Sequence, residues 1–240
     1  MRKIAIFVEG QTELIVVREY LLKWFNYENV EIECRTLFTD SRFLVVPYDF
    51  VTPSPQYHFQ IINVGNDNAV LSRILKREDY MWNAGYDKII GLRDMYSSAY
   101  REISTVIDPN VNQNFINAPI EVINNRAKQP DKIQMCFAIM ETEAWFLGLS
   151  EIFELIDERL TNAFIHENTG KDLENIDPET DVFHPAVLLN NIYNLVEQKY
   201  RKQEGDIEAL AKLIDRADFE SLLIRDKCQS FNQFHDSIHS

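Results

Sequence analysis

The feature that most constrains this chain is a short, uniformly apolar run near its start. Residues 4–8 read IAIFV, and Glu9 and Gly10 follow directly. A run of this length without polar alternation is typical of a strand that is buried on both faces of a parallel sheet. From about residue 12 to residue 25, apolar residues recur at helical spacing. The start of the chain therefore predicts a strand, a tight turn and a helix.

The same alternation continues along the first 149 residues. Further strands are predicted in residues 30–37, 57–65, 86–94 and 132–141, and helices in residues 66–78 and from about residue 142. Asn66 or Asp67 is the expected N-cap of the helix that begins at residue 66. Residues 38–57 contain three prolines and predict an irregular excursion. This order favours a mostly parallel sheet flanked by helices.

The pattern changes after residue 149. Strand signals nearly vanish, and amphipathic helices are predicted in residues 152–160, 184–200, 207–216 and 219–225. Residues 166–183 are rich in acids and predict a loop. We therefore expect an α/β protein with a Rossmann-like, mostly parallel sheet in residues 1–149. Residues 150–240 are expected to form a helical, acidic C-terminal portion packed on this core.

Charge is distributed unevenly along the 240 residues, whose net charge is −14. Residues 1–140 carry 15 basic and 17 acidic side chains, whereas residues 141–240 carry 9 and 21. The second part would repel nucleic acid, so broad non-specific DNA binding is disfavoured. A small nucleic-acid site in which a metal ion neutralises acids remains compatible with this distribution.

Cysteine usage and hydropathy indicate the compartment. The three cysteines are odd in number and far apart in the sequence, which argues against a disulfide framework. The apolar run at the start is too short for a signal peptide, and no stretch of about 18 apolar residues predicts a membrane span. We expect a cytoplasmic protein that does not contact a membrane. Nothing in the sequence indicates an oligomeric state.

Carboxylates follow three of the predicted strands. Glu9, Asp94 and Glu141 each stand at the expected end of a strand, Glu13 follows Glu9 by four residues, and Glu143 follows Glu141 by two. The carboxyl ends of parallel strands line the ligand crevice of an open sheet, so these acids are expected to converge. Clustered carboxylates need a compensating cation, and oxygen ligands suit Mg²⁺ or Mn²⁺. Such a centre can support phosphodiester hydrolysis.

The stretch IFVEGQTE resembles the first motif of the TOPRIM family, which includes topoisomerases, primases and the overcoming-lysogenisation-defect nucleases. In the nuclease branches a second acid follows four residues after the first, and Glu13 matches it. The chain is also similar to small bacterial TOPRIM-like, DUF4276-like proteins, some of which are encoded beside ATPases in defence islands. The resemblance covers residues 3–14, 87–97 and 133–147. It implies a Mg²⁺- or Mn²⁺-dependent nuclease, with phage defence and an ATPase partner as further expectations.

One departure from the TOPRIM pattern bears on activity. The family's second motif has two aspartates, of which Asp94 matches the first, while Tyr96 occupies the second position. This departure leaves three alternatives: the site binds a single metal ion, Glu141 or Glu143 completes the ligand shell, or catalysis has been lost. The five histidines show no ligand spacing in the sequence.

Two classes of function therefore stay open. In the first, the chain cleaves DNA or RNA, and its catalytic residues are Glu9, Glu13 and Asp94. The metal ligands are then Glu9, Asp94, Glu141 and Glu143. Gly10 lets the backbone approach the ligand. In the second, the chain is a non-catalytic module that binds a partner protein, such as an ATPase, or a phosphorylated ligand.

Overall fold

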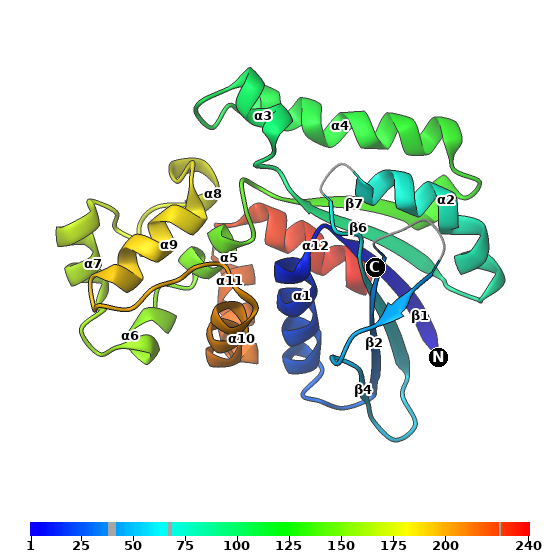
Figure 1. Ribbon diagram of the computed structural model, residues 1–240, viewed down its shortest axis with the longest axis horizontal. Helices are drawn as coiled ribbons and strands as arrows, with labels where there is room; N and C mark the ends of the chain where they lie inside the picture. The colour runs from blue at the N-terminus through cyan, green and yellow to red at the C-terminus, as the bar shows by residue number, and fades with distance from the viewer. Residues whose placement is uncertain (38–41, 67–68, 226) are drawn as a thin grey trace. The chain divides into compact units, whose positions relative to one another are not determined.

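The computed structural model describes residues 1–37, 42–66, 69–225 and 227–240 (Figure 1). The strands are β1 (Arg2–Val8), β2 (Val30–Thr36), β3 (Leu44–Val45), β4 (Phe50–Val51), β5 (Tyr57–Asn63), β6 (Lys88–Asp94) and β7 (Ile133–Ala138). The helices up to β7 are α1 (Gln11–Trp24), α2 (Val70–Asn83), α3 (Ser98–Ile103), α4 (Pro109–Arg126) and the 3₁₀ helix η2 (Pro130–Lys132). After β7 follow α5 (Glu143–Gly148), α6 (Ile152–Ile156), α7 (Asn162–Thr169), α8 (Pro178–Asp181), α9 (Pro185–Asn194), α10 (Glu204–Leu213), α11 (Arg216–Ile224) and α12 (Gln229–His239).

The chain forms two compact units, each built from separated stretches. The first unit comprises Met1–Arg93, Gln113–Phe137 and Gln233–Ser240, and the second comprises Asp94–Asn112 and Ala138–Asn232. The domain boundary expected between residues 149 and 150 stays a prediction, since compactness does not test whether a stretch folds independently.

The described residues form a seven-stranded sheet, most of which lies in the first unit. Its order is β3-β2-β5-β1-β6-β7, with β4 also paired to β2. β2, β5, β1 and β6 run parallel, as expected for apolar strands joined by helical crossovers. β1 is uniformly buried from Ile4 to Val8 and lies between β5 and β6. The mostly parallel sheet confirms the predicted α/β, Rossmann-like class.

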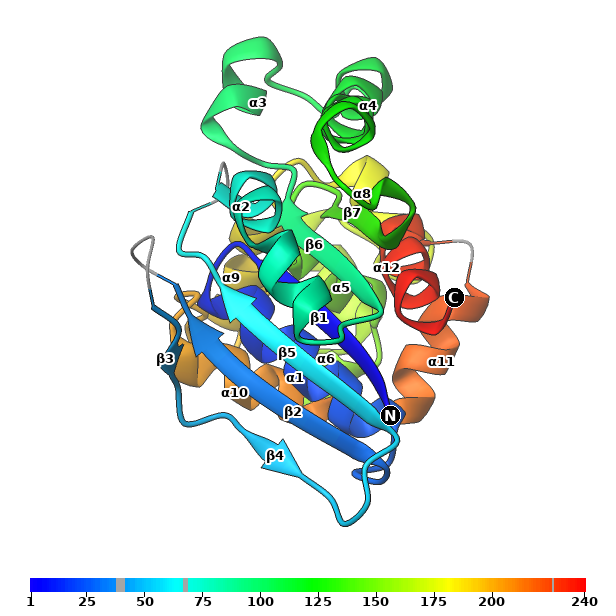
Figure 2. The same cartoon turned by 90° about the vertical axis from the view of Figure 1, so that its right-hand side faces the viewer.

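Helices cover both faces of this sheet. Figure 1 shows α1 on one side and α2 on the other. The chain moves from β1 to β2 in one direction and later from β5 past β1 to β6 in the other. Right-handed crossovers in opposite directions place their helices on opposite faces. Residues 233–239 of the last helix, α12 (Figure 2), belong to the first unit, where Phe234 packs on Tyr20 of α1 with ring centroids 6.1 Å apart.

Three sequence expectations need correction. β7 ends at Ala138, three residues before Glu141. The excursion of residues 38–57 includes two short strands, β3 and β4, which pair antiparallel with β2 at the edge of the sheet. The N-cap of α2 is Ala69, with no capping side chain, so Asn66 is not the cap. Asp67 lies outside the described residues.

The second unit is helical, and it contains two helices where an acidic loop was expected. α7 begins after the N-cap Thr161, whose side chain accepts a hydrogen bond from the Phe164 N–H, and ends at Gly170 with φ 72°. α8 begins after the N-cap Asp177, with Pro178 in the first helical turn. These capping residues outweigh the weak apolar periodicity of the stretch. α6, α9, α10 and α11 overlap the four helices predicted after residue 149, although α6 and α9 end earlier than expected, and α12 was not predicted. No described residue after residue 149 belongs to a strand.

Two further expectations agree with the structure. All three cysteines are buried free thiols. None of the helices in the described part of the chain has the length and apolar character needed to cross a membrane.

Candidate functional site

Three of the predicted acids converge in the second unit. Asp94 is the last residue of β6, while Glu141 follows the turn after β7 and Glu143 begins α5. One carboxylate oxygen from each of the three lies within 4.8 Å of the others. We call Asp94, Glu141 and Glu143 the acid cluster. All three side chains are largely buried, with Glu143 at 0% exposure.

Backbone hydrogen bonds fix the segments that carry these acids. The N–H of Met95 donates to the Ala138 carbonyl at 2.9 Å, and the N–H of Tyr96 donates to the Met140 carbonyl at 2.7 Å. Met140 has φ 63°, a left-handed conformation that costs a non-glycine residue energy and turns the chain sharply after β7. This turn carries Glu141 and Glu143 back beside the end of β6.

Backbone amides also orient two of the carboxylates. The N–H of Thr142 donates to Asp94 Oδ1 at 3.0 Å. The N–H of Ala186, at the start of α9, donates to Glu141 Oε2 at 3.0 Å. This N–H lies at the N-terminus of α9, where the helix dipole is favourable for a neighbouring carboxylate.

Lys202 supplies a positive charge to the acid cluster. Its Nζ lies 3.0 Å from Glu143 Oε2, 3.4 Å from Glu141 Oε1 and 3.5 Å from Asp94 Oδ2. Lys202 itself has φ 56°. A left-handed lysine persists only when its surroundings hold it, and here three carboxylates do so. With all groups ionised, three negative charges and one positive charge leave the cluster negative.

The Glu143 carboxyl has a raised pKa. Burial raises the pKa of its carboxyl, Glu141 adds to this effect, and Lys202 and the Tyr200 hydroxyl oppose it. The Tyr200 O–H donates to Glu143 Oε1 at 2.9 Å. Burial, with the Glu143 charge as a further cause, raises the pKa of Tyr200, so this hydroxyl keeps its proton. A perturbed carboxyl among other acids is typical of a functional site.

The structure places the other predicted residues in the first unit. Glu9 directly follows β1, Gly10 is the N-cap of α1, and the buried Glu13 lies in the first turn of that helix. Gly10 has φ −149°, which other residues also adopt, and a Cβ at this position would lie 3.2 Å from Glu13 Oε2. The Glu13 side chain thus leaves little room for a Cβ, which is an ordinary structural reason for glycine at this position.

A shallow cavity of about 580 Å³ opens at the carboxyl ends of β1, β2 and β5. It is lined by Glu9, Gly10, Gln11, Thr36, Asn63, Gly65 and Asn66. The lining is polar, and the N-terminus of α1 borders it, which is a favourable place for an anionic group. Ligands of open α/β sheets bind at this end of the strands.

Tyr96, at the position of the second TOPRIM aspartate, packs in an aromatic cluster. Its ring centroid lies 5.4 Å from that of Phe183 and 5.0 Å from that of His184. The guanidinium of Arg101 lies over the Tyr96 ring at 5.3 Å. Packing therefore accounts for Tyr96, and it offers the acid cluster no carboxylate.

Sequence reasoning did not identify Tyr200 or Lys202. Both lie in the stretch KYRKQ between α9 and α10, where Lys199, Arg201 and Lys202 are alternative cations. Nothing in this stretch distinguishes the lysine that enters the acid cluster. The only local signal is the neighbouring tyrosine, which is common in buried contacts of every kind.

The donors of the acid cluster fit a hard divalent cation, because all of them are carboxylate oxygens. Asp94, Glu141 and Glu143 would hold it, and the residual negative charge beside Lys202 favours its binding. Lys202 would then have to shift away from the oxygens that the cation takes. In the absence of the cation, the ammonium group neutralises part of the same charge.

Together these features define the class: a Rossmann-like α/β protein with a buried acid cluster after strands β6 and β7. The chain belongs to the family described as "Domain of unknown function (DUF4276)", whose model matches residues 8–239. Comparison with curated proteins and with solved structures gave no match.

Proposed function

We propose that this chain is a TOPRIM-like phosphoryl-transfer protein that uses Mg²⁺ or Mn²⁺, and that its activity is cleavage of DNA or RNA in the cytoplasm. The observation that carries this proposal is the convergence of Asp94, Glu141 and Glu143, with one oxygen of each within 4.8 Å of the others. The strand, Glu-Gly turn and helix at Glu9 give further support. Phage defence with an ATPase partner is the cellular role that the resemblance suggests.

Each residue of the acid cluster has a role in this proposal. Asp94 and Glu141, whose oxygens are oriented by backbone amides, are the principal cation ligands. A bound cation would polarise the phosphate and favour ionisation of a water molecule. Glu143, whose pKa is raised by burial, is suited to exchange a proton with the leaving oxygen. Lys202 provides an ammonium group that can pair with a phosphate oxygen.

Calorimetric titration of the chelator-treated chain with Mn²⁺ tests the metal centre. We expect saturable binding in the wild type, no detectable binding in Asp94→Ala, and weaker binding in Glu141→Gln. Glu102→Gln is the matched control, because Glu102 is an exposed acid of the same unit. Undiminished binding in Asp94→Ala would overturn the proposed centre.

Cleavage assays with single- and double-stranded DNA and RNA test the activity. Product that requires Mn²⁺, is lost in Asp94→Ala and persists in Glu102→Gln would support a nuclease. Cleavage that Asp94→Ala leaves unchanged would assign the activity to something other than the acid cluster.

Glu9 and Glu13 are proposed as catalytic residues on the strength of the motif. Glu9→Ala is expected to remove activity without unfolding the chain, since the change deletes a carboxylate from the partly exposed end of β1. Full activity in Glu9→Ala would remove Glu9 from the proposal and leave the acid cluster as the site.

A second candidate function is a non-catalytic module that binds a partner protein or a phosphorylated ligand. The observation in its favour is that Lys202 contacts all three acids, so part of their charge is compensated by the chain itself. The acidic residues 141–240 also suit a basic protein surface better than nucleic acid.

Two measurements separate this module from the nuclease. Pull-down from native cells with mass spectrometry would recover a stoichiometric partner, such as an ATPase, if the module is correct. A nucleotide screen by thermal shift would show stabilisation without turnover if a phosphorylated ligand binds. Neither result is expected for a nuclease that acts alone.

A further inference from the structure

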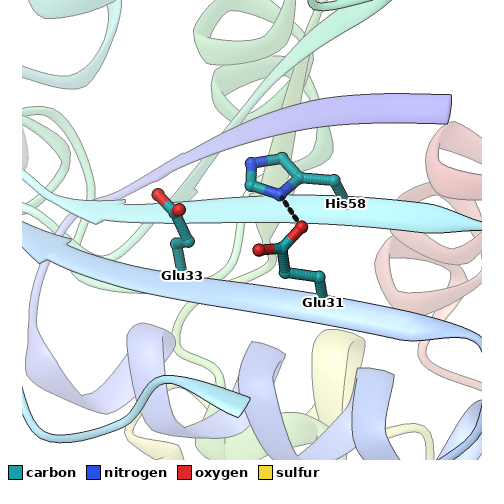
Figure 3. A group of neighbouring side chains, drawn as sticks. All are labelled: Glu31, Glu33 and His58. Atoms are coloured by element: carbon teal, nitrogen blue, oxygen red, sulfur yellow. Dashed lines mark hydrogen bonds and ion pairs between the residues drawn. The ribbon is translucent and has the colours of Figure 1, made fainter. Parts of the chain in front are cut away.

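A row of polar side chains crosses two neighbouring strands in the first unit. Glu31 and Glu33 alternate along β2, and in the parallel register Glu31 stands beside His58 and Glu33 beside Gln60 of β5. Residues two apart on a strand point to the same face, so the pairing gathers these side chains on one face of the sheet. Figure 3 shows Glu31, Glu33 and His58 extending to the same side of β2 and β5.

Three of these side chains can offer ligand atoms to one ion. One atom each from Glu31, Glu33 and His58 lies within 4.8 Å of the others, and we call these residues the sheet cluster. His58 Nδ1 lies 3.0 Å from Glu31 Oε2. The side chains of Glu31 and Glu33 are 30% and 31% exposed, so an ion could reach them from solvent.

A fourth side chain points to a ligand independently. Gln60 is only 7% exposed, and its Nε2 donates to Glu33 Oε2 at 3.1 Å, so its amide group lies against the sheet cluster. Its Oε1 is buried, and no hydrogen-bond partner for it exists among the described residues. A buried amide oxygen without a partner costs free energy. Rotation of the amide would turn this oxygen toward Glu33, where two oxygens could share a cation.

The charges around the sheet cluster favour a divalent cation. Arg35 lies 3.0 Å from Glu33 Oε2 and 2.8 Å from Asp49 Oδ1. With a neutral imidazole, Glu31, Glu33 and Asp49 contribute three negative charges and Arg35 one positive charge. The remaining two negative charges match one divalent ion.

His58 also has the second contact that a metal-binding histidine usually makes. Its Nε2 lies 3.1 Å from the Tyr86 hydroxyl. When Nε2–H donates to the tyrosine oxygen, Nδ1 carries a lone pair directed to the side of Glu31. Such a partner on the second nitrogen fixes the tautomer and the ring orientation of a ligand.

We propose that Glu31, Glu33 and His58, with the Gln60 amide oxygen, bind Zn²⁺. The imidazole distinguishes this site from an all-oxygen centre, since Zn²⁺ accepts mixed nitrogen and carboxylate ligands whereas Mg²⁺ favours oxygen alone. The site is separate from the acid cluster and does not depend on the function proposed for that cluster.

Calorimetric titration of the chelator-treated full chain with Zn²⁺ tests this site. We expect one saturable site that His58→Gln weakens by about 100-fold and Tyr86→Phe by about 10-fold. Zn²⁺ should raise the unfolding temperature of the wild type and leave that of His58→Gln unchanged. If His58→Gln does not fold, Glu33→Gln replaces it, because this variant keeps the shape of the side chain and loses one ligand charge.

Three controls make the result specific. His166→Gln removes an exposed histidine and should bind Zn²⁺ as the wild type does. Asp94→Ala should also retain this zinc site. Failure of the zinc-site proposal is therefore distinguishable from failure of the metal centre proposed at the acid cluster. His235 and His239, with ring centroids 4.4 Å apart, are the rival zinc ligands. Loss of binding in His235→Gln/His239→Gln, or unchanged binding in His58→Gln, would overturn the proposal.

Discussion

The acid cluster and the sheet cluster differ in how the chain assembles them. Asp94, Glu141 and Glu143 come from strand and helix ends and are largely buried around a lysine. Glu31, Glu33 and His58 come from within two paired strands, and both of their acids are about 30% exposed. Burial makes the first group depend on an internal cation, whereas solvent screens the second. Similar ligand groups should therefore respond very differently to the same kind of mutation.

The largest expected effect is loss of the internal cation. Lys202→Met leaves Asp94, Glu141 and the fully buried Glu143 without their ammonium partner. We expect the free energy of unfolding in metal-free buffer to fall by about 3 kcal/mol, as is typical when one partner of a buried ion pair is removed. Urea denaturation measures this change.

The same variant tests whether the acid cluster accepts a metal. Mn²⁺ should restore much of the stability lost in Lys202→Met, because the ion takes the place of the ammonium group. Lys212→Met, which removes an exposed lysine paired with Glu208, should change stability by less than about 0.5 kcal/mol. Loss of stability without recovery in Mn²⁺ would favour a purely structural ion cluster.

Glu179 is another buried acid of the same unit, and it is held by hydrogen-bond donors rather than by a lysine. Glu179 accepts hydrogen bonds from Trp145 Nε1 at 3.2 Å and from the Ser230 N–H at 3.1 Å, and burial raises its pKa to about 7. A raised carboxyl pKa contributes stability below the ordinary value of 4.5, and this contribution is lost as pH rises through about 7. The difference between these values corresponds to about 3 kcal/mol.

Glu179→Gln should remove this pH dependence, since the amide cannot ionise and can still hydrogen-bond with Ser230 and Trp145. Chemical denaturation between pH 4 and pH 8 would show a smaller loss of stability in the variant than in the wild type. The exposed Glu154→Gln serves as the control and should keep the wild-type profile. Identical profiles for wild type and Glu179→Gln would contradict the assignment of this pH dependence to Glu179.

An intermediate effect is expected where a neutral donor supports the acid cluster. Tyr200→Phe removes the hydroxyl that donates to Glu143 Oε1 in a buried setting. Leaving this oxygen without its donor should lower the free energy of unfolding by about 1–3 kcal/mol. The exposed Tyr80→Phe should stay close to the wild type. A value near zero for Tyr200→Phe would mean that water replaces the hydroxyl.

The smallest effect is expected at the sheet cluster in the absence of metal. Glu31→Gln retains an acceptor for His58 and removes one of two neighbouring carboxylates that are about 30% exposed. We expect the stability to change by less than about 0.5 kcal/mol. A loss of stability above about 2 kcal/mol by thermal or urea unfolding would show that the sheet cluster is about as sensitive to mutation as the acid cluster.

The sequence by itself determined the parallel strands of the sheet, but not the antiparallel edge strands β3 and β4. The apolar run at Ile4–Val8 and its successors predicted the parallel strands, because residues buried on both faces cannot alternate with polar ones. It also identified Asp94, Glu141 and Glu143, since acids after strands are expected to meet at the carboxyl edge. These inferences need only local pattern and the general rules of α/β topology.

Only the tertiary structure decided which cation meets those acids and which histidine meets Glu31 in the sheet cluster. Lys202 reaches the acid cluster from a loop some 60 residues beyond Glu141, and no local pattern distinguishes it from Lys199 or Arg201. His58 stands beside Glu31 because β2 and β5 pair in one parallel register, although 27 residues separate them in the sequence. Strand register depends on packing across the whole sheet, so spacing along the chain could not reveal this site.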